Sequence, residues 1–475
     1  MKNKCEVIFL GHAGFLIEAD IRLLCDPWAT KNGAMLGAWH QLPDNCDYIE
    51  SNKSVLTAEF VWLSHEHTDH FDIEFLSKLP QETVFILPKF LTNNMPRALS
   101  QHGFRNIVLL DNGDRFELSP DITVNMILEE PVWSEHSSLV IRSRETVLLH
   151  NSDSYLTKAQ LTKIKAAYKP NIYIGQYSAT SPFPDVMKEW NESQKSGFRN
   201  KHLAWAMNRF VESVQYCGAE TAIPCAGPAV VVEPRRLEVS RQKANLVGGC
   251  MNLKELFGQL SSRLPRVKIK YLSIGQTIAE GCETPPSPSE VLEAIDRVIN
   301  ERYCLNLSIN PSATVEDIRD LHEALFARAC KFAPHIISRI GTCLSIYFSD
   351  LNKRIDTKFI SNTDKGLPKI SVKVCEGVAP AEKSASEYYQ IQLSSDIWCR
   401  YVNNEFVFDE LFYSQRQEIV ESEHGYFSDL ITLLRTLHSE KLLEAANQTV
   451  LEHNTENVTV YHEGEKHVIS KFCPH

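Results

Sequence analysis

The sequence predicts a protein of the α/β class with more than one domain. Short apolar segments, with the length and residue types of buried strands, alternate with loops and helices from residue 5 to about 278. The chain has 475 residues, which is more than one ordinary hydrophobic core accommodates. Proline and serine are concentrated at 280–289, as is typical of a linker. We therefore expect an N-terminal α/β domain followed by at least one further domain.

The elements of the first domain are predicted from compact apolar runs. Strands are expected at 6–10, 15–18, 22–25, 60–63, 83–87 and 107–110. The segment 206–217 has the pattern of an amphipathic helix.

Beyond the linker, helical periodicity returns at 289–299 and 314–333. The second of these helices opens with a Thr-x-x-Asp pattern that resembles a capping box. A β-hairpin is expected between 458 and 470. The expected domains are 1–280, a smaller α+β accessory domain at 289–450, and a C-terminal β fragment at 456–475.

Charge and composition argue against several classes of partner. The net charge is -11 and no basic cluster is visible, which argues against binding to nucleic acid or to acidic membranes. No apolar run approaches the length of a membrane span, and the N-terminus lacks the apolar segment of a signal peptide. The 13 cysteines are odd in number and scattered, which favours reduced thiols and a cytoplasmic location.

The strongest chemical signal is the run His65-Glu66-His67-Thr68-Asp69-His70, directly after the apolar segment 60–63. Alternate residues of an extended segment point the same way, so His65 and His67 can bind one ion. The following turn can direct Asp69 and His70 at a second ion. Imidazole and carboxylate ligands suit zinc, iron or manganese. A histidine-rich surface loop that binds nothing is the alternative.

The pattern His65-x-His67-x-Asp69-His70 matches the signature of the metallo-β-lactamase fold. The segments 11–17 and 24–28 also resemble the first hairpin of that fold. The resemblance implies an αββα sandwich in residues 1–280. It also implies that Asp26 braces the metal-binding loop without binding metal. In a hydrolytic member, Asp69 would orient the nucleophile or take its proton.

The resemblance implies two further ligands downstream of the loop. A histidine before a strand would be the third ligand of the first metal, and His136 fits this position. An aspartate after the next strand would bridge the two metals, and Asp153 fits it. His150 is the alternative to His136.

One expected ligand is replaced. Many members of the superfamily complete the second metal site with a histidine after a buried strand, where this sequence has Cys225. Cysteine binds zinc or iron as a thiolate, although a small buried cysteine is more often part of the core. A site with one ligand fewer would hold one ion, or keep an open position for substrate or dioxygen.

With Cys225 in this position, the sequence resembles the branch that contains CMP-N-acetylneuraminate hydroxylase and its bacterial relatives. The resemblance lies in the segments 26–28, 37–39, 177–184 and 223–228. Those proteins join a metallo-β-lactamase-like domain to a Rieske iron–sulfur domain. The segment 396–416 more loosely resembles a sterol-carrier-like accessory domain.

The end of the chain, Cys473-Pro474-His475 after a predicted strand, resembles the first ligand loop of a Rieske cluster. Such a cluster takes two cysteines and two histidines from two loops. The second loop, Cys-x-x-His, does not occur in the sequence. Cys473 and His475 thus offer half of a 2Fe-2S site, which is truncated, vestigial or completed by a partner.

Two functions are weighed. The first is a metal-dependent oxidoreductase of the oxygenase or hydroxylase type, with one or two iron ions and electrons from a Rieske centre. It would act on a small metabolite or a sugar-nucleotide-like substrate and use a reductase or ferredoxin as electron donor. The alternative is a metal-dependent hydrolase of an ester, lactone, amide or phosphodiester, acting through a metal-bound hydroxide. A scaffold protein that has lost its metal is disfavoured, because the loop at 65–70 is intact.

Four aromatic residues are expected to line a substrate pocket, namely Trp28, Trp39, Tyr177 and Phe183. Aromatic side chains in such loops serve packing as often as recognition.

Overall fold

The computed structural model describes residues 5–178, 181–227, 229–237, 252–280, 284–302, 314–360, 367–378, 388–420, 428–455, 457–462 and 465–470. The chain divides into two compact units. Unit 1 comprises Met1–Asp185, Trp190–Leu307 and Phe412–Arg416. Unit 2 comprises Val186–Glu189, Ser308–Leu411 and Gln417–His475.

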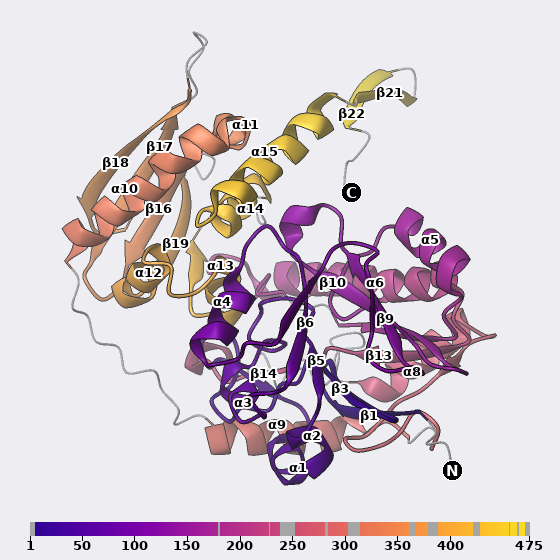
Figure 1. Cartoon of the computed structure of the whole chain (residues 1–475). Coiled ribbons are helices and arrows are strands. Elements are labelled where there is room, and N and C mark those ends of the chain that lie inside the picture. Colours follow the sequence, from indigo (N-terminus) through magenta and orange to yellow (C-terminus); the bar gives the residue numbers. More distant parts are fainter. Residues whose placement is uncertain are drawn as a thin grey trace. The chain divides into compact units, whose positions relative to one another are not determined.

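Unit 1 is built on two sheets that face each other (Figure 1). The first sheet has six strands in the order β1 (Glu6–Gly11), β2 (Gly14–Glu18), β3 (Arg22–Cys25), β5 (Phe60–Trp62), β6 (Val84–Pro88) and β7 (Ile107–Leu110). The second has seven strands in the order β15 (Lys268–Ile269), β13 (Thr221–Cys225), β12 (Ile172–Gln176), β11 (Val147–His150), β10 (Ser137–Arg142), β9 (Thr123–Leu128) and β8 (Arg115–Glu117).

Helices cover the outer face of each sheet. The first sheet packs against α1 (Cys46–Ser51), α2 (Lys53–Leu56), α3 (Ile73–Leu76) and α4 (Asn94–Gln101). The second packs against α5 (Lys158–Tyr168), α6 (Glu192–Cys217) and α8 (Leu253–Arg263) (Figure 1). Unit 1 is therefore an αββα sandwich, which confirms the predicted fold class.

The strands of unit 1 appear in the sequence as continuous apolar runs because both faces of each sheet are buried. In β2, Phe15 and Ile17 enter the core between the sheets, whereas Leu16 packs toward the helices. Successive side chains of a strand point to opposite faces, so a strand buried on both faces is a continuous apolar run.

Helix α6 is longer than the predicted helix at 206–217. It begins after Asn191, whose side chain accepts a hydrogen bond from the backbone N–H of Gln194 in a capping box, and it ends at Gly218. Apolar periodicity underestimates the length of this helix, because its first three turns contain few apolar residues.

Helix α9 (Pro288–Arg302) packs in unit 1, whereas the sequence assigns its residues to the accessory domain. Its side chains Val291 and Ile295 lie in one apolar cluster with Val230 and Val232, next to the two-stranded sheet of β4 (Trp39–Gln41) and β14 (Ala229–Val231). The linker-like composition at 280–289 therefore precedes a helix that still belongs to the first core.

Unit 2 combines one sheet with several helices. The sheet has the order β18 (Lys369–Glu376), β17 (Lys353–Ile360), β16 (Cys343–Phe348), β19 (Tyr388–Leu393) and β20 (Glu418–Val420). The helices are α10 (Val315–Phe332), α11 (Pro334–Arg339), α12 (Ser395–Val402), α14 (Ser428–Thr436) and α15 (Glu440–Thr455). Helix α13 (Phe408–Ser414) contains the point where the chain passes from unit 2 to unit 1. The capping box at Thr314 and Asp317 is confirmed.

The expected C-terminal hairpin is formed by β21 (Asn457–His462) and β22 (Glu465–Ser470), which pair antiparallel. Cys473 and His475 lie outside the described residues. The boundaries 289–450 and 456–475 remain predictions. None of the described helices is both long enough and apolar enough to cross a membrane.

Phe104 offers a test of the packing in unit 1. Its side chain is fully buried between the first sheet and α4, with its ring centroid 4.7 Å from that of Phe85. Replacement of Phe104 by Ala should lower the free energy of unfolding by about 3–5 kcal/mol, because it leaves a cavity. Leu109→Ala is the control, since Leu109 is 47% exposed and the change should cost under about 0.5 kcal/mol. Equal shifts in urea-induced unfolding, followed by tryptophan fluorescence, would contradict the described packing.

Candidate metal centre

The loop after β5 turns sharply and buries its histidines. The backbone N–H groups of His70 and Phe71 both donate to the carbonyl oxygen of His67, at 2.9 and 2.7 Å. Asp72 fixes the end of the loop, because its carboxylate accepts from the backbone N–H groups of Ala29 and Phe75 at 2.9 and 3.0 Å. The turn gives the four predicted ligands of the loop two different directions.

The first group of potential ligands contains His65, His67 and His136, whose ligand atoms lie within 4.8 Å of one another. Nε2 of His65 is 2.8 Å from Nδ1 of His67. Nδ1 of His136 lies 2.8 Å from the carbonyl oxygen of Ser134. A carbonyl only accepts, so Nδ1 carries the proton and Nε2 keeps a lone pair for a metal.

The second group contains His12, Asp69 and His70, and a third contains His65, His70 and Asp153. Nε2 of His12 is 3.0 Å from Oδ2 of Asp69. Nε2 of His70 is 3.6 Å from Oδ2 of Asp69 and 3.5 Å from Oδ2 of Asp153. His65 and His70 each belong to two of the three groups. The groups therefore share residues and form one continuous cluster of seven side chains.

Three buried atoms of this cluster have no hydrogen-bond partner among the described residues: Nε2 of His70, Oδ1 of Asp69 and Oδ1 of Asp153. A buried polar atom without a partner costs about 1–3 kcal/mol, so native structures rarely keep one without a reason. Three such atoms on neighbouring side chains fit the place of a cation. The donor set of imidazoles and carboxylates suits zinc, iron or manganese.

The charge states of His65 and Asp69 suit a metal. Burial, together with the neighbouring His70 and His136, holds the pKa of His65 well below its usual value, so its imidazole is neutral. Burial alone would raise the pKa of Asp69, but the adjacent His70 and His12 hold it below its usual value. A neutral imidazole and an ionised carboxylate are the forms that bind metal.

Asp26 lies behind the cluster and is fully buried. Its carboxylate accepts from Oγ of Ser64 at 2.7 Å, from Oγ of Ser152 at 2.6 Å and from Nδ1 of His70 at 2.9 Å. Burial alone would raise its pKa, but His70 and these hydrogen bonds hold the pKa of Asp26 below its usual value. This contact leaves Nε2 of His70 facing Asp69 and Asp153. Burial alone would lower the pKa of His70, but the carboxylates of Asp69, Asp153 and Asp26 hold it well above its usual value, so a metal bound at Nε2 would displace a proton.

His150, the alternative to His136, lies in a different place. Its Nε2 is 3.1 Å from the carbonyl oxygen of Ala13, and its ring packs against Phe15 and Trp62. Burial lowers the pKa of His150 to about 4. Among the described residues it belongs to none of the three ligand groups, and neither does Cys225. Cys225 lies in the core between the sheets, where burial holds the pKa of its thiol well above the usual value.

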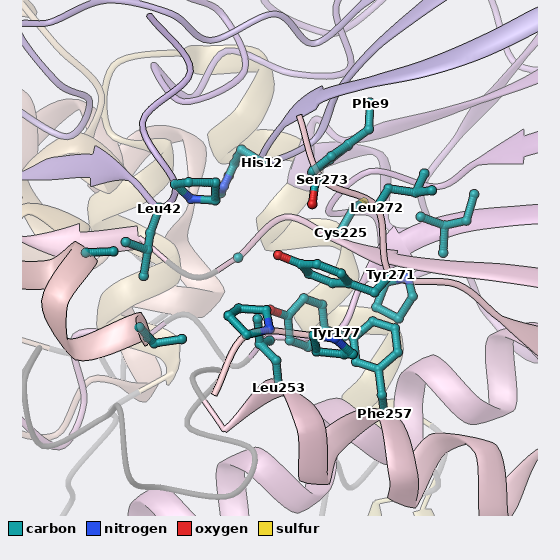
Figure 2. Close-up of a pocket in the computed structure, with 18 of the residues that line it drawn as sticks. Phe9, His12, Leu42, Tyr177, Cys225, Leu253, Phe257, Tyr271, Leu272 and Ser273 are labelled. Atoms are coloured by element: carbon teal, nitrogen blue, oxygen red, sulfur yellow. The ribbon is translucent and has the colours of Figure 1, made fainter. Parts of the chain in front are cut away.

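A pocket of about 500 Å³ lies beside His12 (Figure 2). Of the four aromatic residues expected to line a pocket, Tyr177 is in its wall. Trp28 packs edge-on against the ring of His12 at 5.0 Å, Trp39 donates from Nε1 to the carbonyl oxygen of Tyr413 at 2.8 Å, and Phe183 packs against Phe412. These last three therefore serve packing around the cluster, outside this pocket.

Sequence reasoning missed two residues of the cluster and its surroundings. His12 follows Gly11 in the turn between β1 and β2 and has a positive φ of 50°. A histidine in a glycine-flanked turn after a buried strand was the available signal. Tyr413 lies with its ring centroid 5.7 Å from that of His67, although 346 residues separate the two in the sequence. No local pattern points to such a contact.

Comparison with known proteins finds sequence similarity to one protein family and to several relatives. Residues 6–167 match the family described as "Beta-lactamase superfamily domain". Two relatives, from Mycolicibacterium smegmatis and Mycobacterium tuberculosis, bear the name "Putative Rieske 2Fe-2S iron-sulfur protein". Each is 27% identical over 237 residues, which are 48% of this chain and 45% of the relative. The chain thus matches less than half of the length of these relatives.

Similar solved structures include an isothiocyanate hydrolase from Delia radicum gut bacteria, with a TM-score of 0.37 and 12% identity over 58% of this chain and 98% of that one. Another is the rubredoxin oxygen:oxidoreductase from Desulfovibrio gigas, with a TM-score of 0.23 and 8% identity over 62% and 90%.

The family match spans β1 to α5 and includes all seven residues of the cluster, from His12 to Asp153. Residues 6–167 are thus similar in sequence to the β-lactamase superfamily domain, and the αββα sandwich of unit 1 agrees with that similarity.

Proposed function

We propose that the protein is a metal-dependent oxidoreductase of the oxygenase or hydroxylase type, acting on a small molecule. The observation that carries the metal dependence is the seven-residue cluster with its three unpartnered buried atoms. His65, His67 and His136 would hold one ion, and His12, Asp69 and His70 a second, with Asp153 between them. Iron bound there would supply one-electron chemistry with dioxygen.

The residues around the cluster would hold its protons and geometry. Asp26 keeps the proton of His70 on Nδ1, and Ser134 does the same for His136. Asp69 is ionised, with Oδ1 buried and without a hydrogen-bond partner among the described residues, so it can accept a hydrogen bond from a bound nucleophile. We assign to Asp69 the catalytic role of orienting that nucleophile, as well as a place in the ligand set.

The oxygenase type is supported by the relatives named as Rieske 2Fe-2S proteins and by the Cys473-Pro474-His475 sequence. A Rieske centre passes one electron at a time, which suits dioxygen chemistry. In this proposal a reductase or ferredoxin in the cytoplasm would be the electron donor, and a 2Fe-2S cluster would be completed by ligands beyond Cys473 and His475.

Hydrolysis of an ester, lactone, amide or phosphodiester is the second candidate, and His12 favours it. The replacement of a histidine by Cys225 suggests an incomplete second site, but His12 supplies an imidazole to the second group. Two complete sites suit a hydrolase, in which zinc or manganese lowers the pKa of water and polarises the scissile group.

Metal analysis and low-temperature EPR of the full-length, reduced protein distinguish the two. The oxygenase predicts iron in the protein and a Rieske-type signal. Zinc alone, without an iron–sulfur signal, would contradict the oxygenase and leave the hydrolase.

Replacement of both His65 and His67 by Ala should abolish binding at the first site, because it removes two of the three imidazoles there. The measurement is metal content per chain after gel filtration, and His102→Ala is the control because His102 is exposed and outside the ligand groups. Unchanged metal content in the double variant would refute the assignment.

Replacement of Asp26 by Asn should weaken metal affinity about 10–100-fold, because His70 would lose the acceptor that orients it. Competition with a chromophoric chelator measures the affinity. The control is Asp20→Asn, an exposed position near the same hairpin. An Asp26→Asn variant with the metal affinity of the wild type would show that metal binding by His70 does not depend on the contact with Asp26.

His12→Ala and Cys225→Ala test which residue completes the second site. We expect His12→Ala to lose the second equivalent of metal and Cys225→Ala to keep both, because only His12 stands among the ligand groups of the described residues. Calorimetric titration of the metal-free protein gives the stoichiometry. The reverse pattern would assign the thiol as ligand.

A further inference from the structure

The pocket beside the cluster is built from parts of unit 1 that are distant in sequence. Phe9 and His12 come from β1 and the turn that follows it, and Cys225 from the end of β13. Leu253 and Phe257 belong to α8. Figure 2 shows His12 and Ser273 on one side of the pocket, with Leu253 and Phe257 on the opposite side. With a volume of about 500 Å³, it has the size of a small-molecule site.

Its wall is predominantly apolar. Twelve of the twenty lining residues have side chains of carbon and hydrogen alone: Phe9, Leu42, Pro43, Ile223, Pro224, Leu253, Phe257, Leu272, Pro285, Pro286, Val291 and Ala294. Among the described lining residues, one carries a carboxylate, namely Glu290. No lysine or arginine stands among these twenty, whereas recognition of a phosphate usually employs such a group.

The polar groups of the wall are few. The hydroxyl-bearing residues are Tyr177, Tyr271, Ser273 and Thr284. In Figure 2 the hydroxyl of Ser273 lies on the same side as His12. An apolar pocket with a small number of polar groups binds an apolar body and orients one polar function.

The pocket also borders the metal cluster directly. His12 is in the wall, and its Nε2 is 3.0 Å from Oδ2 of Asp69 in the second ligand group. A molecule seated in the pocket would therefore have one end next to that group.

We propose that this pocket binds the uncharged apolar body of the substrate, an aliphatic or aromatic molecule with one polar function directed at His12. The role of the bound molecule as a substrate rests on the proposed metal-dependent function. Binding of such a molecule in the pocket does not depend on that function. An uncharged apolar substrate differs from the sugar-nucleotide-like substrate expected from the sequence. The described wall offers apolar contacts, whereas a nucleotide needs hydrogen-bond or charged partners for its phosphate.

Binding of an uncharged fluorescent probe, 6-propionyl-2-(dimethylamino)naphthalene, tests this without an activity assay. The wild type should bind it with a blue-shifted emission, with or without metal. Ala294→Phe places a ring into the pocket and should weaken binding at least tenfold. Arg297→Phe is the matched control, because it adds the same ring at an exposed position of α9 outside the pocket.

Phe257→Ala provides a second variant should Ala294→Phe fail to fold. It removes an apolar wall from a half-buried helix position and should weaken probe binding severalfold. The position next to the cluster is tested by NMR of the probe, whose signals should broaden with Mn²⁺-loaded protein but not with Zn²⁺-loaded protein.

Equal probe affinity in wild type and in the folded Ala294→Phe and Phe257→Ala variants would overturn the proposal. So would displacement of the probe by CMP, or bound Mn²⁺ that leaves the probe signals sharp. If the protein binds no metal but the variants weaken probe binding as expected, the pocket stands and the proposed metal-dependent function fails.

Discussion

A buried carboxylate, that of Asp26, joins three loops that the rest of the site depends on. It follows β3, and its backbone N–H donates to the carbonyl oxygen of Trp62 in β5 at 3.0 Å. Its side chain then accepts from Ser64 and His70 of the loop after β5 and from Ser152 of the loop after β11. Several charge-assisted hydrogen bonds offset the cost of burying the charge. The imidazole of His70 thus takes its orientation from a residue that belongs to none of the three ligand groups among the described residues.

The second ligand group is completed from the start of the chain. His12 approaches Asp69 from the turn between β1 and β2, while Cys225 lies in the core between the sheets and in the wall of the adjacent pocket. The apolar wall and the ligand cluster therefore meet at His12. This arrangement would place an apolar molecule next to the ligand cluster, where the one carboxylate of the described wall is that of Glu290.

Local sequence patterns predicted most of the sandwich and much of the candidate site. Strands buried on both faces leave continuous apolar runs, so β1, β2 and β3 were expected close to their actual bounds. The structure brings His65, His67 and His136 together as expected, and places Asp153 beside His70. Whether they bind metal remains a prediction.

Long-range packing escaped prediction for physical reasons. His12 joins Asp69 and His70 because β1 and β5 run in the same direction in the first sheet and end at the same edge. Tyr413 reaches His67 because Phe412–Arg416 returns to unit 1. Helix α9 packs in unit 1, whereas its sequence position places it in the second expected domain, because composition does not reveal which core a helix packs on. Spacing reports neighbours within one element, whereas these contacts join elements distant in sequence.

X-ray absorption spectroscopy of the metal-loaded protein tests the central claim that one cluster of imidazoles and carboxylates holds two ions. The account predicts a shell of nitrogen and oxygen scatterers without sulfur, and a metal–metal distance of about 3.5–4 Å. A sulfur scatterer at about 2.3 Å, as expected of a thiolate ligand such as Cys225, would contradict it. So would a spectrum without a metal–metal contribution at two bound equivalents.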